Sequence, residues 1–160
     1  MMLVHNFDLK KLSISCGISL GLGALSSFIS MFGRDNFENA VKPSLNPPGW
    51  LFPIVWTILF LLMGISAYLI YKSDSDDEDK TKALTVYGVQ LLVNFFWPII
   101  FFNFSAYLLS SIWIILLLIL IIVMIKLFYD IDKTAGYLQI PYLIWVVFAT
   151  YLTIAITILN

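Results

Sequence analysis

Aromatic and amide side chains recur at helical spacing in three parts of the sequence. Each set occupies positions i, i+4, i+7 and i+11, and therefore one face of a helix. The sets are Phe52, Trp56, Leu59 and Met63; Gln90, Asn94, Trp97 and Phe101; and Pro141, Trp145, Phe148 and Leu152. Together such faces would form a pocket of flat aromatic surfaces with a few hydrogen-bonding groups, which suits a large planar apolar ligand. Helix packing and an aromatic belt at the membrane surface are open alternatives.

Groups for acid–base or metal chemistry are scarce. The single histidine, His5, lies in the N-terminal tail, and the single cysteine, Cys16, stands alone in an apolar stretch. Met63 and Tyr68 are weak candidates for haem ligands. The long apolar runs contain no Asp, Glu, Lys or Arg to carry protons or ions. We therefore expect no catalytic acid or base, no metal site and no required cofactor.

The distribution of charge assigns the chain to a membrane. Hydrophobic residues make up 61% of it and charged residues 12%, about half the fraction usual in soluble proteins. Each uncharged run exceeds the roughly 20 residues that a helix needs to cross a bilayer. These runs are 12–33, 43–71, 83–125 and 134–160. This composition excludes a soluble enzyme, a disordered chain and a disulfide scaffold. The net charge of −1 gives no excess of basic residues of the kind that binds nucleic acid.

The longest uncharged run is long enough for two helices, with a polar interruption at Asn103-Phe104-Ser105. We therefore predict an all-α membrane protein, a five-transmembrane-helix bundle forming a single domain over residues 1–160. The first run exceeds the apolar core of a signal peptide, so it is interpreted as a span. The acidic cluster at 74–79 is expected to be a solvated loop. The predicted helices are about 9–31, 52–71, 83–102, 106–128 and 136–158.

Five spans place the two termini on opposite sides of the membrane. Seven basic residues fall on the N-terminal side, and only Arg34 and Lys42 fall on the other. The excess of basic residues predicts a cytoplasmic N-terminus and an outer C-terminus in the cytoplasmic membrane. Segment 32–51 is then the large outer loop, and its prolines and Gly49 favour an ordered lid.

Small residues recur at four-residue spacing in the first helix. They form two sets, Ser13, Gly17 and Gly21, and Ser19, Gly23 and Ser27. Small residues let helix backbones approach closely in lipid. Packing within the bundle and contact between two copies of the chain are both consistent with this pattern.

Three longer motifs resemble those of one family. The first is Lys42-Pro43-Ser44-Leu45-Asn46-Pro47-Pro48-Gly49-Trp50 followed by Pro53-Ile54-Val55-Trp56. The second is Gln90-Leu91-Leu92-Val93-Asn94-Phe95-Phe96-Trp97-Pro98 with Phe101-Phe102, and the third is Pro141-Tyr142-Leu143-Ile144-Trp145 with Phe148-Ala149-Thr150. In order and spacing, from about residue 37 to the C-terminus, they resemble the translocator protein family, also called the tryptophan-rich sensory proteins, TspO/MBR.

The resemblance implies a five-helix bundle with a ligand pocket near the first loop, usually as a homodimer. It implies membrane lipid as a partner, and as ligands porphyrins such as protoporphyrin IX, and synthetic benzodiazepine-type and isoquinoline carboxamide compounds. Carried over by motif, and with Phe148 added from its helical spacing, the candidate ligand-binding residues are Phe52, Pro53, Val55, Trp56, Asn94, Trp97, Pro98, Trp145, Phe148, Ala149 and Leu152.

Some positions depart from the family pattern. Asn36-Phe37 replaces the usual Trp-Tyr pair of the loop, and Leu45 replaces a common Trp, so weaker stacking by the loop is expected. No basic residue follows Tyr151, so sterol recognition is not expected. Thr85 and Val89 replace the small residues associated with dimer contact on the third helix.

Porphyrin binding, in sensing, trafficking or stress response, is the leading functional hypothesis. Asn94 would orient the ring, and Lys42 or Arg34 would pair with its propionates or mark the membrane boundary. A porphyrin transporter is one alternative, although no inverted repeat is visible. Light-dependent porphyrin breakdown is another, with Trp56 and Trp145 as a photochemical pair. A partner-binding scaffold is a third.

Overall fold

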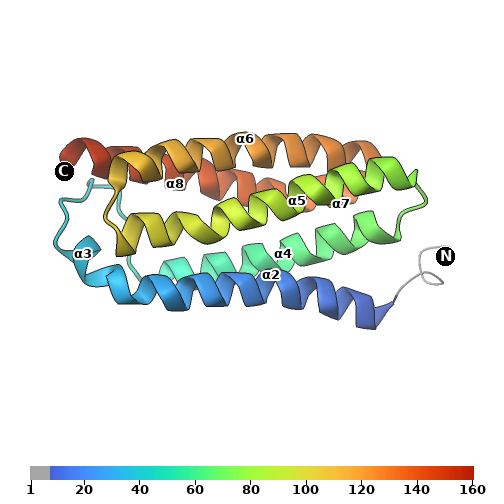
Figure 1. Cartoon of the computed structure of the whole chain (residues 1–160), viewed down its shortest axis with the longest axis horizontal. Coiled ribbons are helices and arrows are strands. Elements are labelled where there is room, and N and C mark those ends of the chain that lie inside the picture. The colour runs from blue at the N-terminus through green and yellow to red at the C-terminus, as the bar shows by residue number, and fades with distance from the viewer. Residues whose placement is uncertain (1–7) are drawn as a thin grey trace.

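A computed structural model describes residues 8–160, a part of the chain that does not include His5. Figure 1 shows long helices lying side by side, with the ends of successive helices joined at opposite ends of the bundle. Within the described residues, five helical segments are long and apolar enough to span a membrane, which confirms the predicted fold class. The long helices are α2 (Leu9–Ser30), α4 (Leu51–Lys72), α5 (Asp77–Pro98), α6 (Tyr107–Ile131) and α8 (Ile140–Leu159).

Several predicted helix boundaries were wrong. The third helix begins at Asp77 rather than at residue 83, because three exposed acidic residues fit the positive end of the helix dipole in its first turn. Half of the expected acidic loop is therefore helical. The same helix ends at Pro98 and continues as a π-helical turn, η2 (Ile99–Asn103). The fourth helix extends to Ile131 instead of residue 128.

The fifth span consists of two helices. A short helix, α7 (Lys133–Leu138), precedes α8, and Gln139 separates them. Pro141 lies in the first turn of α8, where its missing N–H costs nothing, so it begins a helix rather than kinking one. The predicted turn between the third and fourth spans is confirmed, and Ser105 there adopts a positive φ of 50°.

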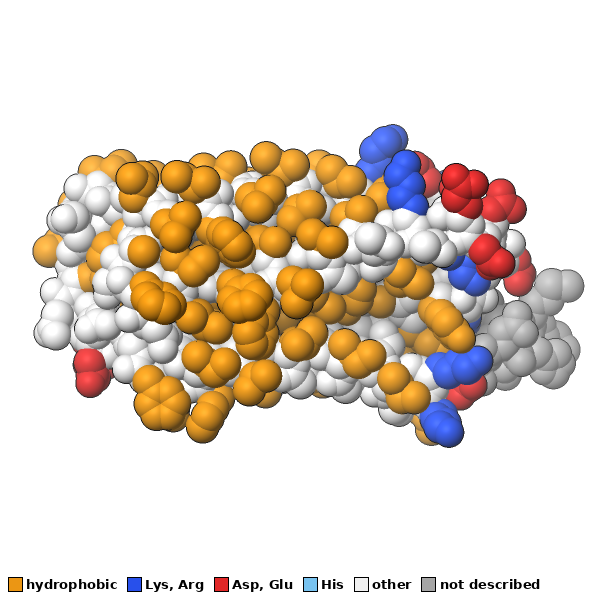
Figure 2. Space-filling view, viewed as in Figure 1, with side chains coloured by type: hydrophobic (Ala, Val, Ile, Leu, Met, Phe, Trp, Pro, Cys, Tyr) orange, Lys and Arg blue, Asp and Glu red, His pale blue; other side chains and the backbone are white. Residues whose placement is uncertain are grey.

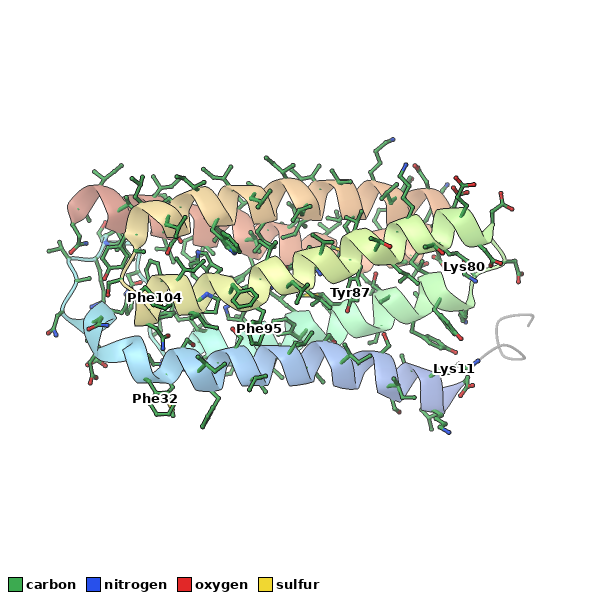
Figure 3. All side chains as sticks on the ribbon, viewed as in Figure 1. Lys11, Phe32, Lys80, Tyr87, Phe95 and Phe104 are labelled. Carbon is green, nitrogen blue, oxygen red and sulfur yellow. The ribbon has the colours of Figure 1, made fainter. Side chains whose placement is uncertain are left out.

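The segment predicted to be the outer loop, a name kept below, contains a 3₁₀ turn, η1 (Met31–Gly33), and a short helix, α3 (Arg34–Glu38). Figure 1 shows this segment at the end of the bundle where the C-terminus also lies. On the face shown in Figure 2, the visible Lys and Arg side chains and most of the acidic ones gather at the opposite end, while the middle is covered by apolar side chains. Figure 3 places Lys11 and Lys80 at the charged end and Phe32 and Phe104 at the other.

Serine hydroxyls and glycines bring α2 close to α4. The hydroxyls of Ser15 and Ser19 donate hydrogen bonds of 2.7 Å to the carbonyl oxygens of Gly64 and Phe60, respectively. Gly64 faces the backbone of Cys16 with no room for a side chain. Lipid cannot supply these partners, so small polar residues are an effective way to join two membrane helices.

The two sets of small residues on α2 therefore have different surroundings. Ser19 and Gly23 face α4, and Gly23 lies against the ring of Phe60. Gly17 and Gly21 have open space where a side chain would stand.

Hydrogen bonds also join the other helices that are close neighbours. Ser26 on α2 donates to the Phe95 carbonyl on α5, at 2.7 Å. Trp113 on α6 donates its indole N–H to the Val93 carbonyl on α5, at 2.7 Å. Between α6 and α8, Thr157 shares a 2.7 Å hydrogen bond with Ser111. These contacts give the order α2, α4, α8, α6, α5 around the bundle, and the α4–α8 seam closes the ring.

Candidate functional site

A groove of about 670 Å³ lies between α4 and α8. Its outer edge is open, since Ile58 on α4 is 53% exposed and Ile144 on α8 is 65% exposed. Both residues lie within membrane-spanning helices, so the groove faces the hydrocarbon of the bilayer. The residues that line it are Val55, Ile58, Leu59, Pro141, Ile144, Trp145 and Phe148.

Aromatic rings form a wall between the two helices. The Phe52 ring meets the Trp145 ring edge-on at a centroid distance of 5.7 Å. Trp145 also contacts Phe148 at 5.6 Å. Trp56 packs beside this pair, 5.7 Å from Phe60 and 6.3 Å from Tyr142. The wall therefore brings together four predicted site residues, Phe52, Trp56, Trp145 and Phe148.

A buried tyrosine joins the two amides that were predicted to face the pocket. The Asn94 amide donates to the Tyr142 hydroxyl at 2.7 Å, and that hydroxyl donates to the Gln90 side-chain oxygen at 2.7 Å. Tyr142 is 1% exposed, and its ring contacts Trp56. The Gln90 amide lies 4.0 Å from the Met63 sulfur, a weak acceptor. Asn94 is thus held inside the bundle by α8.

The remaining candidates occupy three other environments. Ala149 and Leu152 are buried in α8, and Pro53 is exposed near the start of α4. Trp97 stacks on Phe101 at 5.3 Å, just before the end of α5 at Pro98. The indole N–H groups of Trp97 and Trp145 are buried and have no hydrogen-bond partner within the described residues. Of these two donors, only that of Trp145 belongs to a residue that lines the groove.

The structure therefore places the predicted site residues in different parts of the bundle. Val55, Trp145 and Phe148 line the groove, and Phe52 and Trp56 stand at its aromatic wall. The candidates on α5 stay inside the bundle or at its outer end. None of the residues that line the groove is an acid or a base, so the groove offers shape and aromatic contact. Within the described part of the chain, no cluster of three or more potential metal ligands was found.

Sequence reasoning missed the role of Tyr142 and the groove edge formed by Ile58 and Ile144. A tyrosine in an uncharged span must find a partner for its hydroxyl, and that requirement was available as a signal. Nothing in the sequence distinguished Ile58 and Ile144 from the many other aliphatic residues that face lipid.

The two outer cations lie at the edge of the bundle. Lys42 donates to the Glu38 carbonyl at 3.1 Å, and its ammonium lies 4.8 Å from the centre of the Phe37 ring. Arg34 lies 3.4 Å from the Ser27 hydroxyl. Neither cation is among the residues that line the groove.

Comparison with known proteins identifies the family. The sequence model of the TspO/MBR family matches residues 15–159, which cover all three motifs and all five spans. The chain belongs to the TspO/MBR family. It is 35% identical to the tryptophan-rich protein TspO of Chlorobaculum tepidum, over 97% of this chain and 99% of that protein. It is 32% identical to the human translocator protein, over 84% of this chain and 80% of the relative. Protein CrtK of Rhodobacter capsulatus is 33% identical over 78% of each chain.

Replacing Tyr142 with Phe tests the buried hydrogen bonds that join Tyr142 to Asn94 and Gln90. The change removes one hydroxyl and leaves Asn94 and Gln90 without partners, so we expect a loss of about 1–3 kcal/mol in the free energy of unfolding. Thermal unfolding in detergent is the measurement. Tyr151→Phe on the same helix is the control, because Tyr151 is 44% exposed. Equal melting temperatures for the two variants would contradict the assigned role.

Proposed function

We propose that this TspO/MBR protein binds a tetrapyrrole such as protoporphyrin IX at the α4–α8 groove. The supporting observation is the position of the groove against the aromatic wall of Phe52, Trp56 and Trp145. Flat rings prefer stacked or edge-on contact with one another, which a planar macrocycle can offer on both faces. The same site would accept benzodiazepine-type and isoquinoline carboxamide compounds.

The physical basis of affinity differs from that of a pocket in a soluble protein. The bilayer is as apolar as the groove, so a ligand dissolved in lipid gains little from leaving its surroundings. Selectivity then depends on contact with flat side chains and on the indole donor of Trp145. A linear hydrocarbon offers neither flat faces nor acceptors, and a tetrapyrrole offers both.

A double substitution tests the placement. We expect Trp56→Ala with Trp145→Ala to weaken protoporphyrin binding about tenfold or more, equivalent to about 1.4 kcal/mol. Absorbance of the porphyrin in lipid nanodiscs is the measurement, since tryptophan fluorescence would lose two of its reporters. Trp50→Ala is the control, because Trp50 is 68% exposed in the outer loop. Unchanged affinity in the double variant would refute this placement.

The proposal includes an orientation in the cytoplasmic membrane. The lysine-rich end of the bundle would face the cytoplasm, and the outer loop and C-terminus would lie outside. A homodimer is also proposed, with the open stripe of Ser13, Gly17 and Gly21 as one surface available to it.

Cysteine labelling tests the orientation. In a Cys16→Ala background, Ser44→Cys places a thiol in the outer loop and Ser75→Cys places one between α4 and α5. A membrane-impermeant maleimide added to intact cells is expected to label position 44 at once and position 75 only after the membrane is disrupted. The reverse pattern would overturn the orientation.

A further inference from the structure

We infer that the ligand enters the groove sideways from the bilayer, through the seam between α4 and α8, and not from the aqueous side past the outer loop. This inference rests on the proposed function, since it concerns how that site is filled. It restricts the ligand to molecules that dissolve in the hydrocarbon of the membrane.

The outer loop is attached to the end of the bundle at several points. Asn160, beyond the last turn of α8, accepts from the Val41 N–H at 3.0 Å and donates to the Val41 carbonyl at 2.9 Å. Asn36 donates to the Phe102 carbonyl at 3.2 Å. A loop held on both sides in this way must break several contacts before it can admit a molecule as large as a porphyrin.

Aromatic packing closes the same end further. The Phe37 ring lies 5.7 Å from Phe101 and 5.4 Å from Phe102. Gly33 lies against the backbone of Phe102 and leaves no space for a side chain between loop and bundle. Trp97 and Tyr107 pack on Phe101 from within the bundle. Entry from the aqueous side would therefore require the loop and this cluster to separate.

The α4–α8 seam is built differently from the other four seams. Hydrogen bonds between helices cross each of those four, from α2 to α4, α2 to α5, α5 to α6, and α6 to α8. Among the residues that line the groove, Trp145 has the one polar side-chain atom, its indole nitrogen, and this atom is unpartnered. Ring contacts, Phe52 with Trp145 and Trp56 with Tyr142, join the helices there.

This seam is fixed at its cytoplasmic end and free along the groove. The Ser66 hydroxyl on α4 donates to the Ala135 carbonyl on α7 at 2.8 Å, and Ser66 is fully buried. The break at Gln139 then separates α7 from α8. The groove residues on α8 all lie beyond that break. Rotation of side chains at the groove edge, a fast motion, can widen the seam without breaking a hydrogen bond.

The edge of the groove also suits a ligand that arrives from lipid. Ile58 and Ile144 are more than half exposed and frame the opening from the two helices. A polar molecule would lose its hydration at this depth without gaining a partner. The apolar macrocycle of a porphyrin loses little on the way in and meets Trp145 inside, while its propionates would stay at the membrane surface.

Kinetics separate an entrance from a binding site. A substitution that narrows an entrance slows association, whereas one that only removes a contact in the site speeds dissociation. Ile144 lines both the opening and the groove, so the association rate constant is the quantity that decides. We therefore propose Ile144→Trp, which adds a bulky ring at the exposed edge, with Ile112→Trp on α6 as the matched control, since Ile112 is 59% exposed and does not line the groove.

The measurement is stopped-flow transfer of protoporphyrin IX between lipid vesicles and the protein in vesicles of phosphatidylcholine. In Ile144→Trp we expect the association rate constant to fall about tenfold, as for a barrier raised by about 1.4 kcal/mol. Ile144→Phe should slow association less. Ile112→Trp should match the unchanged protein. Circular dichroism confirms that each variant is folded.

A second variant tests the aqueous route. Asn160→Ala removes both hydrogen bonds to Val41 and loosens the loop. Faster loading in Asn160→Ala, with normal rates in Ile144→Trp, would overturn lateral entry. Unchanged association in Ile144→Trp would also overturn it, whatever the change in Kd, because the α4–α8 edge would then not be the entrance. Failure of the unchanged protein to bind protoporphyrin would refute the proposed function itself. This result is distinct from the two results that would overturn lateral entry alone.

Discussion

Lipid provides no hydrogen-bond partners, and this constraint shapes the bundle. A polar side chain inside the membrane is stabilised when it finds a partner in the protein, and most of those between the helices do. The serines of α2 satisfy the requirement by donating to carbonyl oxygens of α4 and α5, and Trp113 does so between α6 and α5. Polar residues therefore determine which helices lie closest together. Apolar residues, which contact lipid and protein equally well, fill the space between them.

The groove is a consequence of the same constraint. Where α4 and α8 face one another beside the aromatic wall, the lining carries one polar side-chain atom, and nothing pulls the two backbones together. Tyr142 instead directs its hydrogen bonds across the bundle to Asn94 and Gln90 on α5. Bulky rings separate α4 from α8, and a hollow remains on the lipid side. Two of the motif tryptophans, Trp56 and Trp145, thus stand at this seam.

The sequence predicted the number of helices well because the absence of charge over about 20 residues is a strong physical signal. It predicted the start of α5 poorly, since acidic residues such as Asp77 are as compatible with a first helical turn as with a loop. Helical spacing placed Trp145 and Phe148 on one face of a helix. It could not show that the Asn94 amide would donate its hydrogen bond to the Tyr142 hydroxyl. Contacts between helices depend on how the helices are ordered around the bundle, and periodicity within one helix does not contain that information.

A structure of the protein with protoporphyrin IX bound in a lipid environment tests the central claim most directly. The account predicts density for the macrocycle between α4 and α8, with one face against Trp145 and an edge reaching lipid between Ile58 and Ile144. Density enclosed beneath the outer loop near Phe37, with the α4–α8 groove filled by lipid alone, would contradict it.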